Sequence, residues 1–251
     1  MDTGKRASPF QTAAPLILAS GSPRRQEFLC TLGLKFKVAV SHLEEPPFTD
    51  GDPARYVLEM AEAKGRAVSG SHPRSWVVAA DTIVIIGHEV LGKPKTEKEA
   101  ISMLGRLSGR WHEVITAFCL LHHEKGAAYK KAVQSRVKIK KLTMAEVTSY
   151  VVTGEPMDKA GAYAVQGIGA FMVEKIAGSY TNVVGLPLSE VIEAMQAVGI
   201  IRPRVAFSVQ GVPLARYRTW KVLLRIAFSL LAAVGAASCC EFRGRYAFGK
   251  H

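Results

Sequence analysis

Two arginines follow a Ser-Gly-Ser turn near the start of the chain, in the run Leu16–Arg25 (LILASGSPRR). Pro23 suits the first position of a helix, because its missing N–H would have no partner there, and Ser22 suits the N-cap. Such a helix start offers unpaired N–H groups, and Arg24 and Arg25 add two cations that can contact phosphate oxygens in bidentate fashion. The segment therefore predicts a phosphate-binding loop, although an ordinary strand–turn–helix with two solvated arginines fits these residues equally well.

Asp81 is the first candidate for a catalytic group. It follows the apolar run Trp76–Ala80 (WVVAA), and this pattern places it where a buried strand ends. A carboxylate at a strand end is held rigidly while it still faces a cleft. It could accept the proton of an attacking water, or hold a metal ion that lowers the pKa of that water. The alternative is an Asp that only caps the turn after the strand.

Further charged residues could complete a site for a phosphorylated ligand. Lys64 in AEAKGRA and Lys93 in LGKP carry compact ammonium groups that suit phosphate oxygens. Both could equally be surface lysines, which is where most lysines lie. Glu44 and Glu45 form an acidic pair, and one of them could join Asp81 in holding Mg²⁺ or Mn²⁺ against substrate phosphates. The alternative for this pair is a solvated acidic loop.

Several motifs along the chain together resemble one family. In order they are ASGSPRR from Ala19, ADT around Asp81, GKP from Gly92, LSGRWHEV from Leu107, GEPMDKAGAYAVQG from Gly154 and GSYTNVVGLPL from Gly178. The series resembles the Maf family of nucleoside triphosphate pyrophosphatases over residues 15–200. Several motifs in the right order are far more specific than any one of them alone.

The resemblance implies an activity and a role for each candidate residue. The activity is metal-assisted attack of water on the α-phosphorus of dTTP or UTP, which yields the nucleoside monophosphate and pyrophosphate. Asp81 matches the family's catalytic base, and Glu45, the second acid of its loop, joins Asp81 as a ligand of Mg²⁺ or Mn²⁺. The phosphate contacts fall on Ser20, Arg24, Arg25, Lys64 and Lys93.

Three residues match the positions at which the dTTP/UTP branch of the family reads the base, and they are Arg24, Thr82 and Gln166. A related branch that prefers a methylated guanine nucleotide has Trp at the first position and acids at the other two, and this chain has none of these replacements. Gln166 can both donate to and accept from a pyrimidine edge. Otherwise it is a loop amide that satisfies nearby backbone groups.

Two other functions stay open. The first is a pyrophosphatase for modified or purine nucleotides, which a panel of substrates would distinguish from the dTTP/UTP enzyme. The second is a non-catalytic nucleotide-binding interaction protein linked to septum formation, as the family's association with that process suggests. A purified protein that released no pyrophosphate from any nucleotide would support this second alternative.

The elements that must position these residues alternate between strands and helices, which indicates an α/β fold. Helices are expected at 53–68, 96–107, 143–152 and 189–198, and strands at 76–80 continued by 83–86, at 113–122 and at 128–141, the last two as an antiparallel pair. The resemblance implies a mixed twisted sheet flanked by helices, with two lobes around a nucleotide cleft.

The chain divides into a disordered leader (1–15), a body (16–200) and a basic, partly apolar extension of unknown role (201–251). The extension carries +8 of the formal net charge of +12. The modest excess on the body therefore favours a small polyanionic substrate over nucleic acid. The apolar run Ile226–Ala237 is short for a bilayer, so membrane insertion is not expected.

The cysteines and the N-terminal segment bear on location. The four cysteines show no metal-ligand spacing, and they are too few for a disulfide scaffold, which favours a reducing compartment. The N-terminal segment lacks the apolar core of a secretory signal. A cytoplasmic enzyme is therefore expected, and a homodimer is possible.

Overall fold

The described residues form a seven-stranded mixed sheet. The computed structural model describes residues 8–41, 43, 46–204, 208–209 and 212–213. The strands run in the order β3-β2-β4-β6-β7-β8, and β5 pairs with β4. The strands are β2 (Leu16–Leu18), β3 (Lys37–Val38), β4 (Trp76–Ile86), β5 (Glu89–Leu91), β6 (Trp111–His122), β7 (Ala127–Ile139) and β8 (Val173–Ala177). β2 is parallel to β3 and β4, and the other pairs are antiparallel, which confirms the expected α/β class and mixed sheet.

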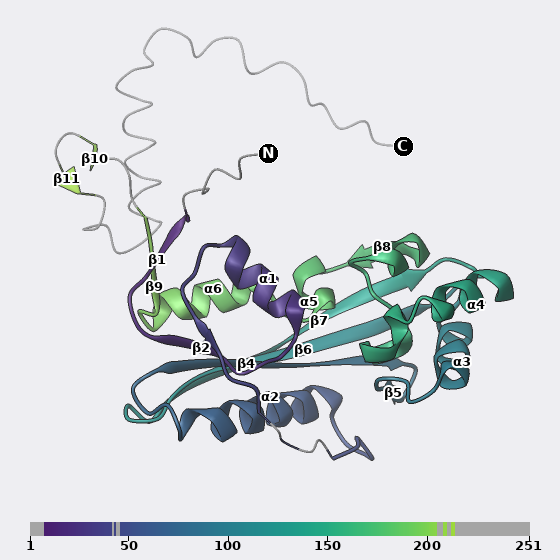
Figure 1. Cartoon of the computed structure of the whole chain (residues 1–251), viewed down its shortest axis with the longest axis horizontal. Helices are drawn as coiled ribbons and strands as arrows, with labels where there is room; N and C mark the ends of the chain where they lie inside the picture. The colour runs from purple at the N-terminus through teal and green to yellow at the C-terminus, as the bar shows by residue number, and fades with distance from the viewer. Residues whose placement is uncertain (1–7, 42, 44–45, 205–207, 210–211, 214–251) are drawn as a thin grey trace, which may run out of the picture. The chain divides into compact units, whose positions relative to one another are not determined.

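Helices cover both faces of this sheet (Figure 1). The helices are α1 (Pro23–Thr31), α2 (Pro53–Ser69), α3 (Glu97–Leu107), α4 (Met144–Val152), α5 (Tyr180–Val184) and α6 (Leu188–Ala197), with short 3₁₀ helices η1 (Glu155–Asp158), η2 (Ala160–Ala162) and η3 (Ile168–Met172). α1 and α6 lie on one face and α2 on the other, while α3 and α4 lie at the far end (Figure 1). The two central strands, β4 and β6, are buried along almost their whole length.

The expected helices begin and end within one residue of their predicted positions. Local capping explains this agreement. The Thr96 side chain accepts a hydrogen bond from the backbone N–H of Glu99 at the start of α3. Thr143 and Glu146 form a capping box at the start of α4. The expected antiparallel pair is also confirmed, as β6 and β7.

Two apolar clusters, here called lobes, lie one after the other along one face of β4. On the face that α1 and α6 cover, Trp76, Val78 and Ala80 pack with these helices in one apolar cluster. Farther along the same face, Val84 and Ile86 pack in a second cluster with α3 and α4. Residues of even number on one strand share a face, so Thr82 lies on this face between the two clusters and belongs to neither.

β4 has an unpaired edge between the two lobes. β2 pairs with Trp76–Val78 and β5 with Val84–Ile86, so neither strand pairs with the residues between. The opposite edge of β4 pairs with β6 without interruption, and Asp81 lies opposite Ala117 there. The expectation that Asp81 ends a strand is therefore wrong, because pairing with β6 carries the strand through Asp81 to Ile85.

The expected body, residues 16–200, leaves out two strands that pair with each other. β1 (Phe10–Thr12) lies in the expected leader and pairs antiparallel with β9 (Ile201–Pro203), which lies in the expected extension. Residues 1–203 accordingly form one compact unit. The second unit, residues 204–251, contains the antiparallel pair β10 (Ser208–Val209) and β11 (Val212–Pro213) among its described residues. The role of the extension stays a prediction.

Within the part of the chain that the structure describes, no helix combines the length and the apolar character that crossing a membrane requires. The apolar run at 226–237 lies outside the described residues. The expectation about membrane insertion of that run therefore stays a prediction.

We expect Ile201→Ala to lower the free energy of unfolding by about 2–5 kcal/mol, because it removes a side chain that is buried against the α1/α6 cluster. Arg202→Ala on the same strand is the matched control, since Arg202 is exposed. Chemical denaturation of both variants measures the difference. Equal stabilities would show that β9 contributes nothing to the core.

We also expect buried His112 to make stability depend on pH. Its Nε2 lies 2.8 Å from the hydroxyl oxygen of Tyr163, and burial lowers the pKa of His112 to about 4. The unfolded chain binds this proton near pH 6.5, so stability is complete above that pH and falls as the pH drops towards 4, by about 3 kcal/mol in all.

Denaturation midpoints between pH 7 and pH 4 measure this loss. His112→Gln should reduce the slope, whereas His88→Gln, at an exposed turn, should keep it. A slope that is the same in both variants would contradict the assignment to His112.

Candidate functional site

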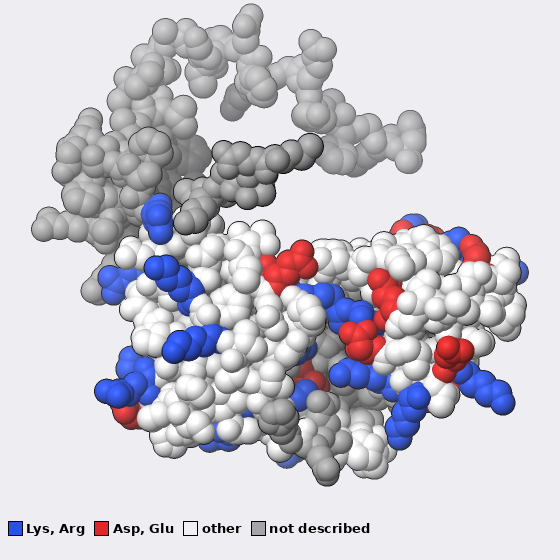
Figure 2. Space-filling view, in the orientation of Figure 1, with Lys and Arg blue, Asp and Glu red and all other residues white. Residues whose placement is uncertain are grey.

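A cavity of about 850 Å³ lies at the unpaired edge of β4. Its walls come from the loop after β2, from α1, α2 and β4, and from the segments around η1 and η2. It is lined by every predicted site residue that the structure describes: Ser20, Arg24, Arg25, Lys64, Asp81, Thr82, Lys93 and Gln166. Glu45 lies outside the described residues. Figure 2 shows a hollow on this face where basic and acidic side chains lie close together.

Asp81 and Lys64 form an ion pair in the wall of the cavity. Asp81 faces α2, and the Lys64 Nζ of that helix lies 2.6 Å from the Asp81 Oδ1. Both side chains are largely buried, at 10% and 13% exposed. Among the described residues, no hydrogen bond is found at the Asp81 Oδ2. The pair therefore orients the carboxylate and leaves one oxygen for a ligand in the cavity.

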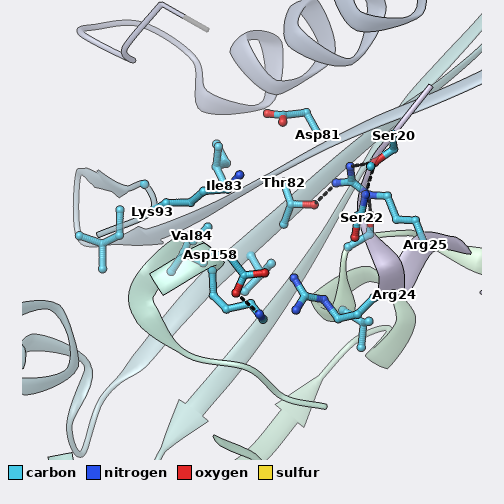
Figure 3. Close-up of a pocket in the computed structure, with 18 of the residues that line it drawn as sticks. Ser20, Ser22, Arg24, Arg25, Asp81, Thr82, Ile83, Val84, Lys93 and Asp158 are labelled. Carbon is cyan, nitrogen blue, oxygen red and sulfur yellow. Dashed lines mark hydrogen bonds and ion pairs between the residues drawn. The ribbon is translucent and has the colours of Figure 1, made fainter. Parts of the chain in front are cut away.

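Arg25 lies beside β4, at the stretch of its edge that neither β2 nor β5 pairs with. Its guanidinium donates hydrogen bonds to the Ala80 carbonyl at 2.9 Å, to the Ser20 Oγ at 3.0 Å and to the Thr82 Oγ1 at 3.1 Å (Figure 3). Its Nε donates to the Gly185 carbonyl at 2.7 Å. At least four of its five N–H groups are thus directed at protein acceptors, which differs from the bidentate phosphate contact expected of this residue.

Gly185 lets the chain approach this guanidinium closely. Its φ is +119°, which disfavours any residue with a side chain. A Cβ at this position would also lie 3.3 Å from the Thr82 Oγ1 and 3.7 Å from the Arg25 Nε. A glycine therefore meets both the conformational and the steric requirement of this turn.

Thr82 belongs to a buried chain of hydrogen bonds. Its Oγ1 lies 2.9 Å from the Thr116 Oγ1, and Thr116 donates to the Asn182 carbonyl at 2.8 Å. Because Thr116 uses its hydrogen on Asn182, the Thr82 hydroxyl must donate to Thr116 while it accepts from Arg25. Thr82 thus has no hydrogen left for a nucleotide base, and its expected role in base reading stays a prediction.

The cavity also contains charged residues that sequence reasoning did not single out. Asp158 and Lys159 form an ion pair, and the Arg24 guanidinium is directed toward it from α1 (Figure 3). Burial acts to raise the pKa of Asp158, but the hydrogen bond and charge of Lys159 and the charge of Arg24 outweigh it and lower this pKa. The only sequence signal was their place within the motif GEPMDKAGAYAVQG.

Two further cationic features face the cavity. Lys93 is exposed, lines the cavity and has no ion pair among the described residues. Ser22 occupies the N-cap of α1 as predicted, but its side chain makes no capping bond. Instead, its own N–H is 3.3 Å from the Ser20 Oγ. The first turn of α1 therefore keeps N–H groups that an anion could bind.

Gln166 lines the cavity from the segment between η2 and η3. Its Nε2 donates to the Glu27 Oε2 of α1 at 3.1 Å. Its Oε1 is buried and has no hydrogen-bond partner among the described residues. Sequence reasoning gave Glu27 no role, because the two residues lie 139 positions apart.

Comparisons with known proteins identify the family of this chain. A family model described as "Maf-like protein" matches residues 15–198. The dTTP/UTP pyrophosphatase of Desulfotalea psychrophila is 48% identical over 192 residues, which are 76% of this chain and 98% of that protein. The dTTP/UTP pyrophosphatase of Geobacter sulfurreducens is 46% identical over 186 residues, 74% of this chain and 97% of that protein.

A solved HAM1 protein from Coxiella burnetii aligns with a TM-score of 0.45 and 16% identity, covering 73% of this chain and 99% of that one. The family model covers most of the chain, and the two relatives are matched over nearly their whole length. The chain therefore belongs to the Maf-like protein family.

Proposed function

We propose that the protein hydrolyses dTTP and UTP to the nucleoside monophosphate and pyrophosphate. The observation that carries this proposal is the Asp81–Lys64 pair, which presents a carboxylate oxygen to a cavity that also holds Arg24, Lys93 and a helix N-terminus. The two relatives are named dTTP/UTP pyrophosphatases, which supports the choice of substrate. A cavity of about 850 Å³ is also within the usual range for a small-molecule site.

Asp81 acts as the base in this proposal. Its Oδ2 accepts the proton of the water that attacks the α-phosphorus, while Lys64 holds the other oxygen at 2.6 Å. Because Asp81 lies in the middle of a strand paired with β6, the hydrogen bonds of that pair hold its backbone in place. The bond between the α-phosphorus and the oxygen that bridges it to the β-phosphate then breaks, and pyrophosphate leaves with that oxygen.

The cationic groups hold the phosphates and the leaving group. Arg24 and the first turn of α1 contact one part of the triphosphate, and Lys93 contacts another. Negative charge increases on the departing pyrophosphate as the bond breaks, so these fixed positive groups stabilise the transition state more than the bound substrate. Arg25 contributes by holding the Ser20 hydroxyl and β4 in place.

The Asp81 carboxylate could serve as one ligand of a divalent ion, Mg²⁺ or Mn²⁺. Among the described residues, no group of three or more His, Cys, Asp or Glu residues is arranged to hold a metal ion. Mg²⁺ in nucleotide sites is commonly held by one or two carboxylates together with substrate phosphates, and the Asp81 carboxylate meets that lower requirement. When bound, the ion would neutralise phosphate charge and lower the pKa of its water. Glu45 remains the proposed second ligand.

The cytoplasm is the proposed location. Cys30 and Cys119 are free thiols in the structure. Free thiols fit a reducing compartment. Pyrimidine triphosphates are the proposed substrates. Measuring their hydrolysis in separated soluble and membrane fractions of the cell would test the proposed location.

We expect Asp81→Asn to lower kcat for dTTP and UTP by about 10²–10⁴-fold, because the amide keeps the shape of the carboxylate but cannot accept a proton. Glu124→Gln, at an exposed turn, is the control for loss of one negative charge. Pyrophosphate release measures both variants, and their circular dichroism spectra report on folding. A loss of only a few-fold in a folded Asp81→Asn protein would remove Asp81 from the base role.

The two arginines should respond differently to replacement by lysine. Arg25→Lys loses the planar fork that makes four hydrogen bonds, so we expect it to lower the free energy of unfolding by about 2 kcal/mol or more. Arg24→Lys should change stability by less than about 0.5 kcal/mol and raise KM for the triphosphates. Denaturation and steady-state kinetics measure these effects, and equal stabilities of the two variants would contradict the assignment of Arg25.

A further inference from the structure

The segment 160–166 lines the cavity with uncharged side chains alone. These side chains belong to Ala160, Tyr163, Ala164, Val165 and Gln166. The groups proposed to bind the phosphates, Arg24, Lys93 and the first turn of α1, belong to other segments. Uncharged groups do not compensate a polyanion for its lost hydration, so this segment, here called the uncharged wall, suits the nucleoside part of a nucleotide better than the triphosphate.

A carboxylate behind the uncharged wall accepts three hydrogen bonds. Glu155 begins η1 and is not among the residues that line the cavity. Its Oε1 accepts a hydrogen bond from the Ile168 N–H at 3.0 Å, and its Oε2 accepts one from the Gly169 N–H at 2.8 Å and one from the Tyr150 hydroxyl at 2.8 Å. All three partners are donors, so both oxygens must be acceptors, and an ionised carboxylate meets this requirement.

The pKa of Glu155 agrees with this requirement. Burial acts to raise the pKa, but the three hydrogen bonds and the charge of Lys159 outweigh it and lower this pKa. Glu155 is therefore ionised at neutral pH, and the charge strengthens the hydrogen bonds that it accepts.

Tyr150 connects this carboxylate to the uncharged wall itself. The Tyr150 side chain is buried, and its hydroxyl oxygen accepts a hydrogen bond from the Ala164 N–H at 3.1 Å while the hydroxyl donates to Glu155. The Glu155–Tyr150 pair thus binds the chain at 164 and again at 168 and 169. The part of the uncharged wall between these points is held at both ends.

Two glycines let the chain wrap closely around the Glu155–Tyr150 pair. A Cβ on Gly167, whose φ is +113°, would lie 2.3 Å from the Glu155 Oε1. A Cβ on Gly169 would lie 2.6 Å from the Tyr150 hydroxyl oxygen. The chain is therefore fitted to this carboxylate and this hydroxyl at close range.

We propose that Glu155 is a positioning residue for nucleotide binding, whose carboxylate holds the uncharged wall in the shape that receives the nucleoside. The proposal rests on the proposed function and adds the group that keeps one side of its binding site in place. Asp81 and Lys64 belong to β4 and α2, and these elements supply none of the four hydrogen bonds of the Glu155–Tyr150 pair. Loss of the Glu155 carboxylate should therefore weaken nucleotide binding and spare the chemical step.

Glu155→Gln tests the proposal, because its NH₂ group must face a hydrogen-bond donor at one of the two positions. Isothermal titration calorimetry of the full chain with Mg²⁺ would compare two probes, the α,β-methylene analogue of dTTP and inorganic triphosphate, which has no nucleoside. We expect the variant to bind the dTTP analogue about ten-fold more weakly and inorganic triphosphate within about two-fold of the wild-type protein. In steady-state hydrolysis of dTTP, KM should rise and kcat should stay within about two-fold.

Two further variants and one further measurement support the comparison. Tyr150→Phe removes only the hydroxyl and should weaken binding of the dTTP analogue in the same direction, by less than Glu155→Gln. Glu174→Gln, exposed on β8, is the matched control for loss of one negative charge and should behave as the wild-type protein. In Glu155→Gln, hydrogen exchange of the amides at 164–169 should become faster, while exchange in β4 should stay the same.

An unchanged affinity of Glu155→Gln for the dTTP analogue would overturn the proposal. An equal loss for both probes would also overturn it, since it would show general damage to the structure. If Glu155→Gln does not fold, Tyr150→Phe decides by the same two comparisons. A wild-type protein that fails to bind the dTTP analogue would overturn both proposals. A wild-type protein that binds it but releases no pyrophosphate from dTTP would reject the proposed function and leave the role of Glu155 in binding standing.

Discussion

The gap between β2 and β5 along one edge of β4 is the constraint on which the site depends. A strand edge inside a protein has backbone groups that need partners, and here the Ala80 carbonyl receives the Arg25 guanidinium in place of a neighbouring strand. The same guanidinium also binds Ser20 and the Gly185 carbonyl. One side chain therefore keeps the gap open and joins the helix start, the central strand and the turn after α5 (Figure 3).

The two lobes contribute to the cavity in different ways. The parts joined by Arg25 form one hydrogen-bonded piece that carries the helix N-terminus and the strand with Asp81. The other lobe lines the cavity with Asp158 and Gln166. Gln166 contacts α1 through a single hydrogen bond that its side chain donates to the exposed carboxylate of Glu27. Such a bond is weak beside the core contacts of each lobe. The structure thus combines a rigid side, proposed to bind the phosphates, with a second side whose hydrogen bond across the cleft is weak.

Local signals made the helices and the β6–β7 pair predictable, because caps and alternation of apolar residues act within a few positions. The place of Asp81 was not predictable in this way. Polar residues in WVVAADT look like the end of a strand, and only the pairing with β6 shows that the strand continues. The partners of Arg25 were equally hidden, since Thr82 lies 57 positions away and Gly185 lies 160 positions away. The resemblance of motifs found the residues of the cavity, but it could not distinguish the arginine that holds the fold from the one that faces the cavity.

The open edge also explains how neighbouring residues on one strand can serve one ligand. Asp81 and Thr82 point to opposite faces of β4, and inside an ordinary sheet the adjacent strand would separate their surroundings. Here no strand covers that edge, so the cavity extends around it and is lined by both residues. An elongated ligand can then place one end beside the Asp81–Lys64 pair and the other beside Gln166 in the second lobe. A nucleoside triphosphate, the proposed substrate, has this form, with charge at one end and a flat hydrogen-bonding base at the other. The interruption of the sheet therefore fits the proposed substrate and accounts for the position of the cavity.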